Sequence, residues 1–153
     1  MTRHLAFNRN HPLVRGDIYF SAKDVRANRL GHMDIVQAEH YSRPALVPVT
    51  AGVPGKAQHK PTAVPAERTP GGVELRCRGD SSSYAVYRFE GDGRPGPRAF
   101  SDAEHLVATV HGSGGHSTWV DESAPDGQVT YVVSALDRAH REGPPSTPAR
   151  VRR

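Results

Sequence analysis

The chain has 153 residues, of which 36% are hydrophobic, and it contains 13 prolines and 15 glycines. This composition allows one domain with a modest core, or a small domain plus a fragment, and excludes a long helical bundle. No apolar run approaches the roughly 18 residues of a membrane-spanning helix. The net charge is +4, but the basic residues are scattered, so we expect neither a nucleic-acid nor a membrane partner.

The first fifty residues predict one strand followed by two helices. Residues 1–8 are charged without an apolar stretch, so no signal peptide is indicated and the localisation stays open. Residues 17–20 (DIYF) predict a short apolar strand. Ser21 and Asp24 have the spacing of a capping box, in which the Ser21 side chain accepts an early helix N–H. Helices are predicted at 22–27 and 33–41, before Pro44.

The rest of the chain predicts a linker and then a series of short strands. Residues 50–59 are rich in proline and glycine and predict a linker, so a second domain is expected over residues 60–153. Turn signals separate about seven strands, as an all-β sandwich requires. The predicted strands cover residues 62–66, 73–77, 84–89, 105–110, 117–120, 129–136 and 147–151.

Side-chain alternation predicts which residues of these strands face the core. Because the side-chain period of a strand is two, fixing one residue inward fixes the whole face. The predicted inward set is Val73, Leu75, Cys77, Tyr84, Val86, Trp119, Tyr131, Val133 and Ala135. The same alternation places Tyr87 and Phe89 on the outward face of their strand.

The stretches GGVELRC, SYAVYRFE, TYVVSALDR and REGPPSTPARV together resemble a fibronectin type III domain, over residues 60–153. The resemblance implies a seven-stranded immunoglobulin-like sandwich. It further implies that Tyr131 forms a tyrosine corner, with its hydroxyl bound to the preceding loop, and that Trp119 is a core aromatic residue. Cys77 stands where that family normally has a tryptophan, which implies a smaller core and a less stable domain.

The stretch VRGDIYFSAKD, followed by NRLG, a tyrosine and PALVP, resembles the closing strand and helix of the barrel in bacterial family-10-like glycosidases. In these secreted or lipoprotein hydrolases a fibronectin-like domain often follows the barrel. The resemblance implies that residues 1–49 are a barrel remnant. A complete (β/α)₈ barrel takes about 250 residues, so at most one of its eight units is present.

The barrel resemblance assigns no catalytic residue in this chain. Glycosidases need two carboxylates about 5–10 Å apart, and the strands that would carry them are missing. Ser21 and Lys23 lie where the closing strand meets the active-site face, so at most they would contact substrate in the complete enzyme. Tyr87 and Phe89 are a candidate sugar-stacking platform, with cross-strand packing as the alternative.

Other motifs predict ordinary surface or core positions. The residues Arg78-Gly79-Asp80-Ser81 are typical of a turn, and we expect no integrin partner. His111 and His116 lie five residues apart without further ligands, so no metal and no cofactor are predicted. Cys77 is the sole cysteine and is expected to be a buried free thiol.

Three hypotheses for the function follow. The leading one is a non-catalytic accessory or spacer module, truncated from a glycosidase-like hydrolase. In the second, the chain is one piece of a split glycoside hydrolase whose barrel is encoded separately. The third is a free-standing carbohydrate- or surface-binding module. The expected partner is thus a polysaccharide or a barrel-bearing polypeptide.

Overall fold

The computed structural model describes residues 2–14, 16–62, 64–91, 95–96, 99–100 and 103–152. The chain divides into two compact units, Met1–Ser42 and Arg43–Arg153. No helix within the described ranges is long and apolar enough to cross a membrane.

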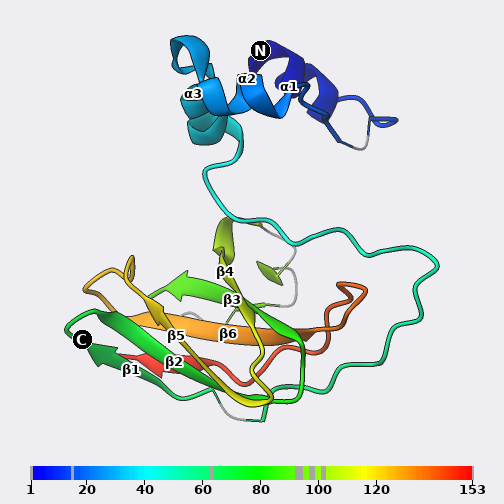
Figure 1. Cartoon of the computed structure of the whole chain (residues 1–153). Helices are drawn as coiled ribbons and strands as arrows, with labels where there is room; N and C mark the ends of the chain where they lie inside the picture. Colours follow the sequence, from blue (N-terminus) through cyan, green and yellow to red (C-terminus); the bar gives the residue numbers. More distant parts are fainter. Residues whose placement is uncertain are drawn as a thin grey trace. The chain divides into compact units, whose positions relative to one another are not determined.

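The first unit is helical and has little core (Figure 1). It contains α1 (Thr2–Arg9), α2 (Ala22–Ala27) and α3 (His32–His40), with a 3₁₀ turn at Arg29–Gly31 before α3. Helices α1 and α3 contact each other, and each carries one buried apolar side chain, Leu5 and Val36. The two predicted helices are therefore confirmed to within a residue, whereas α1 was not predicted.

The predicted strand at residues 17–20 does not form. These residues have no regular secondary structure, and in the described part of the chain they pair with no strand. The side chains of Ile18 and Phe20 are each 98% exposed. A strand satisfies its backbone groups only through neighbouring strands, and the described residues supply none at that place.

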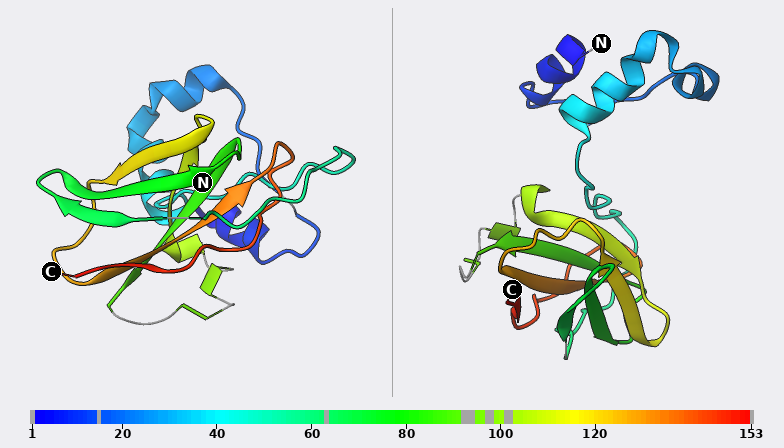
Figure 2. Two further views of the ribbon diagram at one scale, coloured as in Figure 1. Left: turned by 90° about the horizontal axis from the view of Figure 1, so that it is seen from below. Right: turned by 90° about the vertical axis from the view of Figure 1, so that its left-hand side faces the viewer.

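The second unit consists of two antiparallel sheets that face each other as two layers (Figures 1 and 2). One sheet has the order β1-β2-β5 and the other β4-β3-β6-β7. Their bounds are β1 (Ala66–Thr69), β2 (Gly72–Gly79), β3 (Ser83–Glu90), β4 (Leu106–His111), β5 (Gly115–Asp121), β6 (Val129–Leu136) and β7 (Ala149–Val151). The β-rich sandwich expected from the strand pattern is thus confirmed, although the first strand starts four residues later than predicted.

The main core lies between the two sheets, as the alternation predicted. Its buried residues include Val73, Leu75 and Cys77 from β2, Tyr84 and Val86 from β3, and Tyr131, Val133 and Ala135 from β6. Trp119 of β5 is partly buried and packs against this cluster. Every residue of the predicted inward set therefore contacts the core.

A second apolar cluster covers the other face of the four-stranded sheet. It contains Ala85, Tyr87 and Phe89 of β3, Leu106, and Val132 and Leu136 of β6. Leu46, Ala99 and Phe100 pack on it from outside the sheet. Consequently every residue of β6 is buried. A sheet covered on both faces is unusual for an antiparallel sandwich, in which one face commonly meets solvent.

The segment that precedes β1 is attached to the sandwich at several points. The backbone N–H of Thr50 donates to the carbonyl oxygen of Ala139, at 3.0 Å. Arg141 donates to the carbonyl oxygen of Val53 at 2.9 Å, and the Ser81 hydroxyl donates to Gln58 at 2.7 Å. The stretch predicted as a linker therefore contacts the sandwich along its length.

Candidate functional site

Ser21 and Lys23, the residues assigned to a barrel's active-site face, lie at the start of α2 in the first unit. Ser21 is the N-cap residue, but its hydroxyl makes no capping bond and instead donates to the Asp24 carboxylate, at 3.0 Å. The predicted acceptor role of Ser21 is thus wrong, because Asp24 offers a charged acceptor within reach. Lys23 is exposed. The first unit has a cavity of about 630 Å³ beside residues 16–20, but neither Ser21 nor Lys23 lines it. Their contact with a substrate stays a prediction.

Tyr87 and Phe89, the predicted sugar-stacking pair, are covered. Both point to the face opposite Tyr84 and Val86, as the alternation required, but they are only 2% and 7% exposed. The ring of Phe100 packs edge-to-face on both, with centroid distances of 5.4 Å to Tyr87 and 5.9 Å to Phe89. A sugar ring stacks only on an accessible aromatic face. Of the two interpretations of this pair, sugar stacking and packing, packing against a neighbouring segment therefore fits the structure.

The Tyr87 hydroxyl takes part in a polar bridge beneath this cover. It donates to Oε1 of Glu142 at 2.8 Å, and the Ser134 hydroxyl donates to the same oxygen. Burial, together with the hydrogen bond to Glu142, raises the pKa of Tyr87 far above its ordinary value. The phenol therefore stays protonated and serves as a structural donor.

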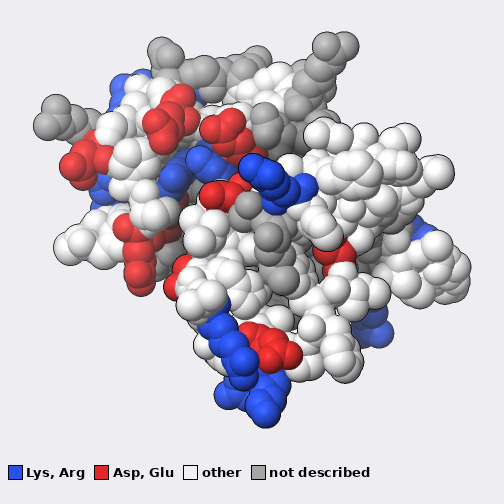
Figure 3. All heavy atoms as spheres, turned by 90° about the horizontal axis from the view of Figure 1, so that it is seen from above, with Lys and Arg blue, Asp and Glu red and all other residues white. Residues whose placement is uncertain are grey.

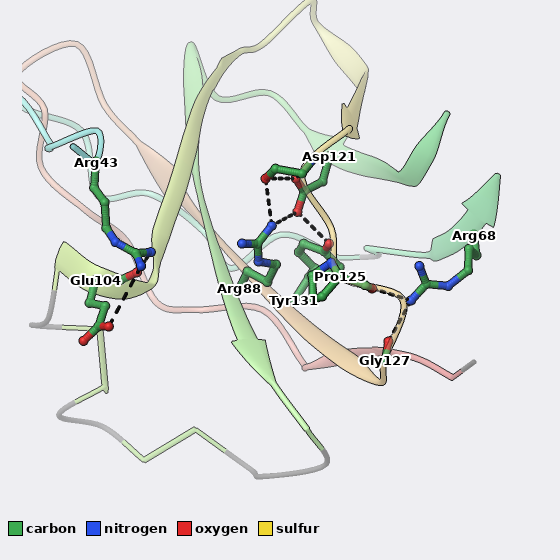
Figure 4. Close-up of polar contacts among 9 residues, drawn as sticks. Arg43, Arg68, Arg88, Glu104, Asp121, Pro125, Gly127 and Tyr131 are labelled. Carbon is green, nitrogen blue, oxygen red and sulfur yellow. Dashed lines mark hydrogen bonds and ion pairs between the residues drawn. The ribbon is translucent and has the colours of Figure 1, made fainter. Parts of the chain in front are cut away.

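Asp121 lies at the centre of a polar cluster that connects the two sheets (Figure 4). It ends β5, and its Oδ2 accepts a hydrogen bond from the Tyr131 hydroxyl of β6 at 2.7 Å and from Arg88 of β3 at 2.8 Å. Its Oδ1 accepts from the backbone N–H and the hydroxyl of Ser123. Tyr131 is thus bound to a carboxylate at the end of the preceding strand, in place of the loop that the tyrosine corner implied.

Burial alone would raise the pKa of Asp121, but hydrogen bonds from Tyr131, Ser123 and Arg88 outweigh it and hold the pKa below its ordinary value. Conversely, burial and the bond to Asp121 raise the pKa of Tyr131. A carboxylate held ionised by three partners is poorly suited to act as a general acid, which needs a raised pKa. The cluster is therefore a structural connection.

The turn after Asp121 is held by a further arginine, also drawn in Figure 4. Arg68 of β1 donates to the carbonyl oxygens of Pro125 at 3.1 Å and Gly127 at 2.7 Å. The sequence reasoning missed both arginines of this region. The signal that could have found the cluster is Asp121 followed two residues later by Ser123, a pattern typical of a turn in which the aspartate caps the backbone.

Cys77 is buried in the main core, and the structure assigns it no reactive role. Burial raises the pKa of its thiol to about 11. Reactive cysteines depend on a lowered pKa, because the thiolate is the nucleophile.

The surface offers no metal centre in the described residues. No group of three or more histidine, cysteine, aspartate or glutamate side chains in these ranges could hold an ion. His111 and His116 are both exposed. On the face shown in Figure 3, lysine and arginine side chains are interspersed with aspartate and glutamate. Such mixed charge is typical of a solvated surface.

The sequence reasoning also missed a polar groove at one end of the sandwich. It lies between residues 54–62 and the turns that follow β2, β4 and β6. Two adjoining hollows, of about 390 and 370 Å³, share Lys56, Gln58, Asp80 and Ser81 as lining residues. We call this the end groove. The sequence motif that could have indicated the end groove is the RGDS turn, because Arg78, Asp80 and Ser81 line the groove.

Comparison with known proteins gives one informative match. No family model matches the chain. A protein named glycosyl hydrolase YngK, from Bacillus subtilis (strain 168), is 32% identical to it over 149 residues. The match covers 92% of this chain and 28% of the relative, so the chain spans less than a third of that protein's length. Because only 8% of the chain lies outside the match, the similarity extends over both units. It supports a glycosidase-related origin.

Proposed function

We propose that the chain is a non-catalytic accessory module, corresponding to the C-terminal part of a glycosidase-like hydrolase. The observation that carries this proposal is the match to glycosyl hydrolase YngK, which leaves 72% of that protein outside the matched part. The unmatched part is more than twice as long as the matched part. That length accommodates the roughly 250 residues of a (β/α)₈ barrel.

The buried carboxylates support a non-catalytic role. In the described residues these are Asp121 and Asp137. Asp121 is occupied by Arg88, Tyr131 and Ser123, and Oδ1 of Asp137 accepts the backbone N–H groups of Ala139 and Arg141, each at 2.8 Å. Both therefore stabilise the sandwich, and neither forms the facing pair that glycoside hydrolysis uses.

Within this proposal the second unit is a fibronectin type III-like domain. Strands β1, β2 and β5 form one sheet, and β3, β6 and β7 lie in the other together with β4. Immunoglobulin-like sandwiches distribute their A, B and E strands and their C, F and G strands in the same way. The strand order therefore supports the resemblance that the sequence suggested.

The test is an assay of the purified chain on a panel of plant and cell-wall polysaccharides, measuring released reducing ends. We expect no hydrolysis, because both buried carboxylates of the described residues, Asp121 and Asp137, are bound by structural partners. The matched control is glycosyl hydrolase YngK itself, assayed on the same panel. Hydrolysis by the chain alone would overturn the accessory role.

A specific observation favours a second candidate, one piece of a split hydrolase. Ile18, Phe20 and Leu30 are almost fully exposed in the first unit. Within this second proposal residues 1–49 are the barrel remnant, and these apolar side chains bury against the rest of the barrel.

This second candidate can be tested with the unmatched part of glycosyl hydrolase YngK as the partner. If the chain completes a barrel, mixing the two polypeptides should restore hydrolysis that neither shows alone. Ile18→Ser with Phe20→Ser should abolish the restored activity, whereas Phe7→Ser, on the exposed side of α1, should not. A mixture without activity or binding would rule out this pairing and leave the accessory role standing.

A further inference from the structure

We propose that the end groove binds a short acidic oligosaccharide, that is, a chain of sugar rings carrying carboxylate groups. The proposal deepens the accessory role and rests on it, since it names the class of ligand that the module would take. Four properties of the groove favour this ligand: its position, its fixed walls, two buried polar groups without a hydrogen-bond partner, and its charge.

The groove occupies the end of the sandwich at which three turns meet. The turns follow β2, β4 and β6, and residues 54–62 close the fourth side. In immunoglobulin-like sandwiches the loops at this end form the antigen-binding site of variable domains, because they project from a rigid scaffold. Each of the two hollows has a volume within the range of small-molecule sites, about 300–1,000 Å³.

The walls of the groove are fixed by short contacts. The Gly112 N–H donates to the carbonyl oxygen of Ser82 at 2.9 Å, and Ser81 is bonded to Gln58. A Cβ atom on Gly112 would lie 1.9 Å from the carbonyl oxygen of Ser81, so only glycine allows the two turns to approach this closely. A preformed site needs little ordering when it binds, which favours affinity.

Two polar groups that line the groove have no hydrogen-bond partner among the described residues. They are the hydroxyl of Tyr84 and Oδ2 of Asp137, which belong to residues that are only 1% and 4% exposed. Oδ2 lies 3.7 Å from the Arg141 guanidinium, which is an ion pair but too long for a hydrogen bond. Buried polar groups are almost always hydrogen-bonded, because a buried group without a partner loses its bonds to water and gains none in return.

The unpaired groups lie in different hollows, Tyr84 in one and Asp137 in the other. Gly79 lies beside the Tyr84 hydroxyl, where a Cβ atom would be 2.8 Å from its oxygen. Burial raises the pKa of Tyr84, and the polar groups of Ser81, which lie close to the hydroxyl but outside hydrogen-bond geometry, lower it by less, so the hydroxyl stays protonated. A phenol donor and a carboxylate acceptor together match the hydroxyl groups of a sugar, each of which both donates and accepts.

The rim of the groove is rich in cations. Lys56, Lys60, Arg78 and Arg138 are exposed and line the groove, and none forms an ion pair within the described ranges. The acidic lining residues are Asp80 and Asp137, and Asp137 is already paired with Arg141. The excess of positive charge selects a ligand with carboxylates in addition to hydroxyl groups. Since Tyr84 is only 1% exposed, it offers no ring face to a sugar, and binding here depends on hydrogen bonds and charge.

The experiment measures binding of the full chain to trigalacturonate by isothermal titration calorimetry. Xylotriose serves as the neutral saccharide and inorganic phosphate as the anion without sugar. We expect trigalacturonate to bind at least about tenfold more tightly than either, and its affinity to fall with rising salt. Lys56→Ala should weaken binding about tenfold. Arg150→Ala, which removes an exposed charge outside the groove, should not.

Tyr84→Phe gives the sharpest test, because it removes only the unpaired hydroxyl. We expect it to weaken trigalacturonate binding about fivefold or more while leaving the melting temperature unchanged or raised. Tyr131→Phe is the matched control, since it removes a bonded hydroxyl: it should lower the melting temperature without affecting affinity. The two readouts separate a ligand-binding hydroxyl from a structural one.

Three results would overturn the inference. The first is that trigalacturonate does not bind, and the second is that phosphate binds as tightly as trigalacturonate. The third is that the Tyr84→Phe and Lys56→Ala variants bind trigalacturonate with the same affinity as the unaltered chain. None of them would affect the accessory role, which fails only if the same samples show cleavage. The two proposals therefore fail on different measurements.

Discussion

Asp121 is the residue on which the connection between the two sheets depends. It accepts hydrogen bonds from Tyr131 and Arg88, which belong to the opposite sheet. Asp121→Asn keeps the shape of the side chain but removes the charge opposite the largely buried Arg88. We expect the free energy of unfolding to fall by about 1–3 kcal/mol, measured by urea denaturation. Asp126→Asn, at an exposed position of the following turn, should change it little, and equal effects would contradict this role.

The same residue predicts how stability depends on pH. The folded-state pKa of Asp121 is lowered from its ordinary value of 3.8. Below pH 3.8 the unfolded chain therefore takes up a proton that the folded protein still excludes. The free energy of unfolding therefore decreases as the pH is lowered. Asp121 contributes its full stabilisation above about pH 3.8 and loses it as the pH falls through the lowered folded-state pKa. Urea midpoints between pH 5 and 2 should fall more steeply for the unaltered chain than for Asp121→Asn. Parallel curves would show that Asp121 is not responsible.

At the level of elements, the outer face of the four-stranded sheet depends on its cover. Phe100 packs edge-to-face on Tyr87 and Phe89, both of β3. Phe100→Ala would remove both ring contacts and admit water to the second apolar cluster. We expect a loss of roughly 1–3 kcal/mol in the free energy of unfolding, less than for a fully buried phenylalanine because Phe100 is half-buried.

Phe7→Ala is the control for this prediction, because Phe7 lies in α1 and is mostly exposed. It should leave the unfolding free energy of the sandwich unchanged. If Phe100→Ala proved equally harmless, the cover would not stabilise the sheet, and Tyr87 and Phe89 would again be candidates for contact with a ligand.

At the level of the whole molecule, the two units should differ in their capacity to fold alone. The sandwich has two apolar clusters, whereas the described residues of the first unit bury only Leu5 and Val36 among their large apolar side chains. We expect residues 43–153 to melt cooperatively within about 3 °C of the full chain. Residues 1–42 alone should show no cooperative transition by circular dichroism, because short helices are marginal without tertiary packing. Failure of residues 43–153 to fold would contradict this division.

The sequence by itself determined which residues form the core of the sandwich. Val73, Leu75, Tyr84, Val86 and Tyr131 were predicted to face inward because strand residues alternate strictly, and the hydrophobic pattern fixes which face is buried. The helix at residues 22–27 was likewise predicted, since local pattern and punctuation act within a few residues.

Only the tertiary structure decided the features that depend on residues distant in the chain. Leu46 and Phe100 pack on the cluster that contains Tyr87 although they are distant from Tyr87 in sequence, so alternation could identify the outward face but not whether solvent reaches it. Residues 17–20 have a strand pattern, yet backbone pairing requires a neighbour that no local pattern can supply. The end groove arises because residues 54–62 fold back onto three turns, which is a property of the assembled fold alone.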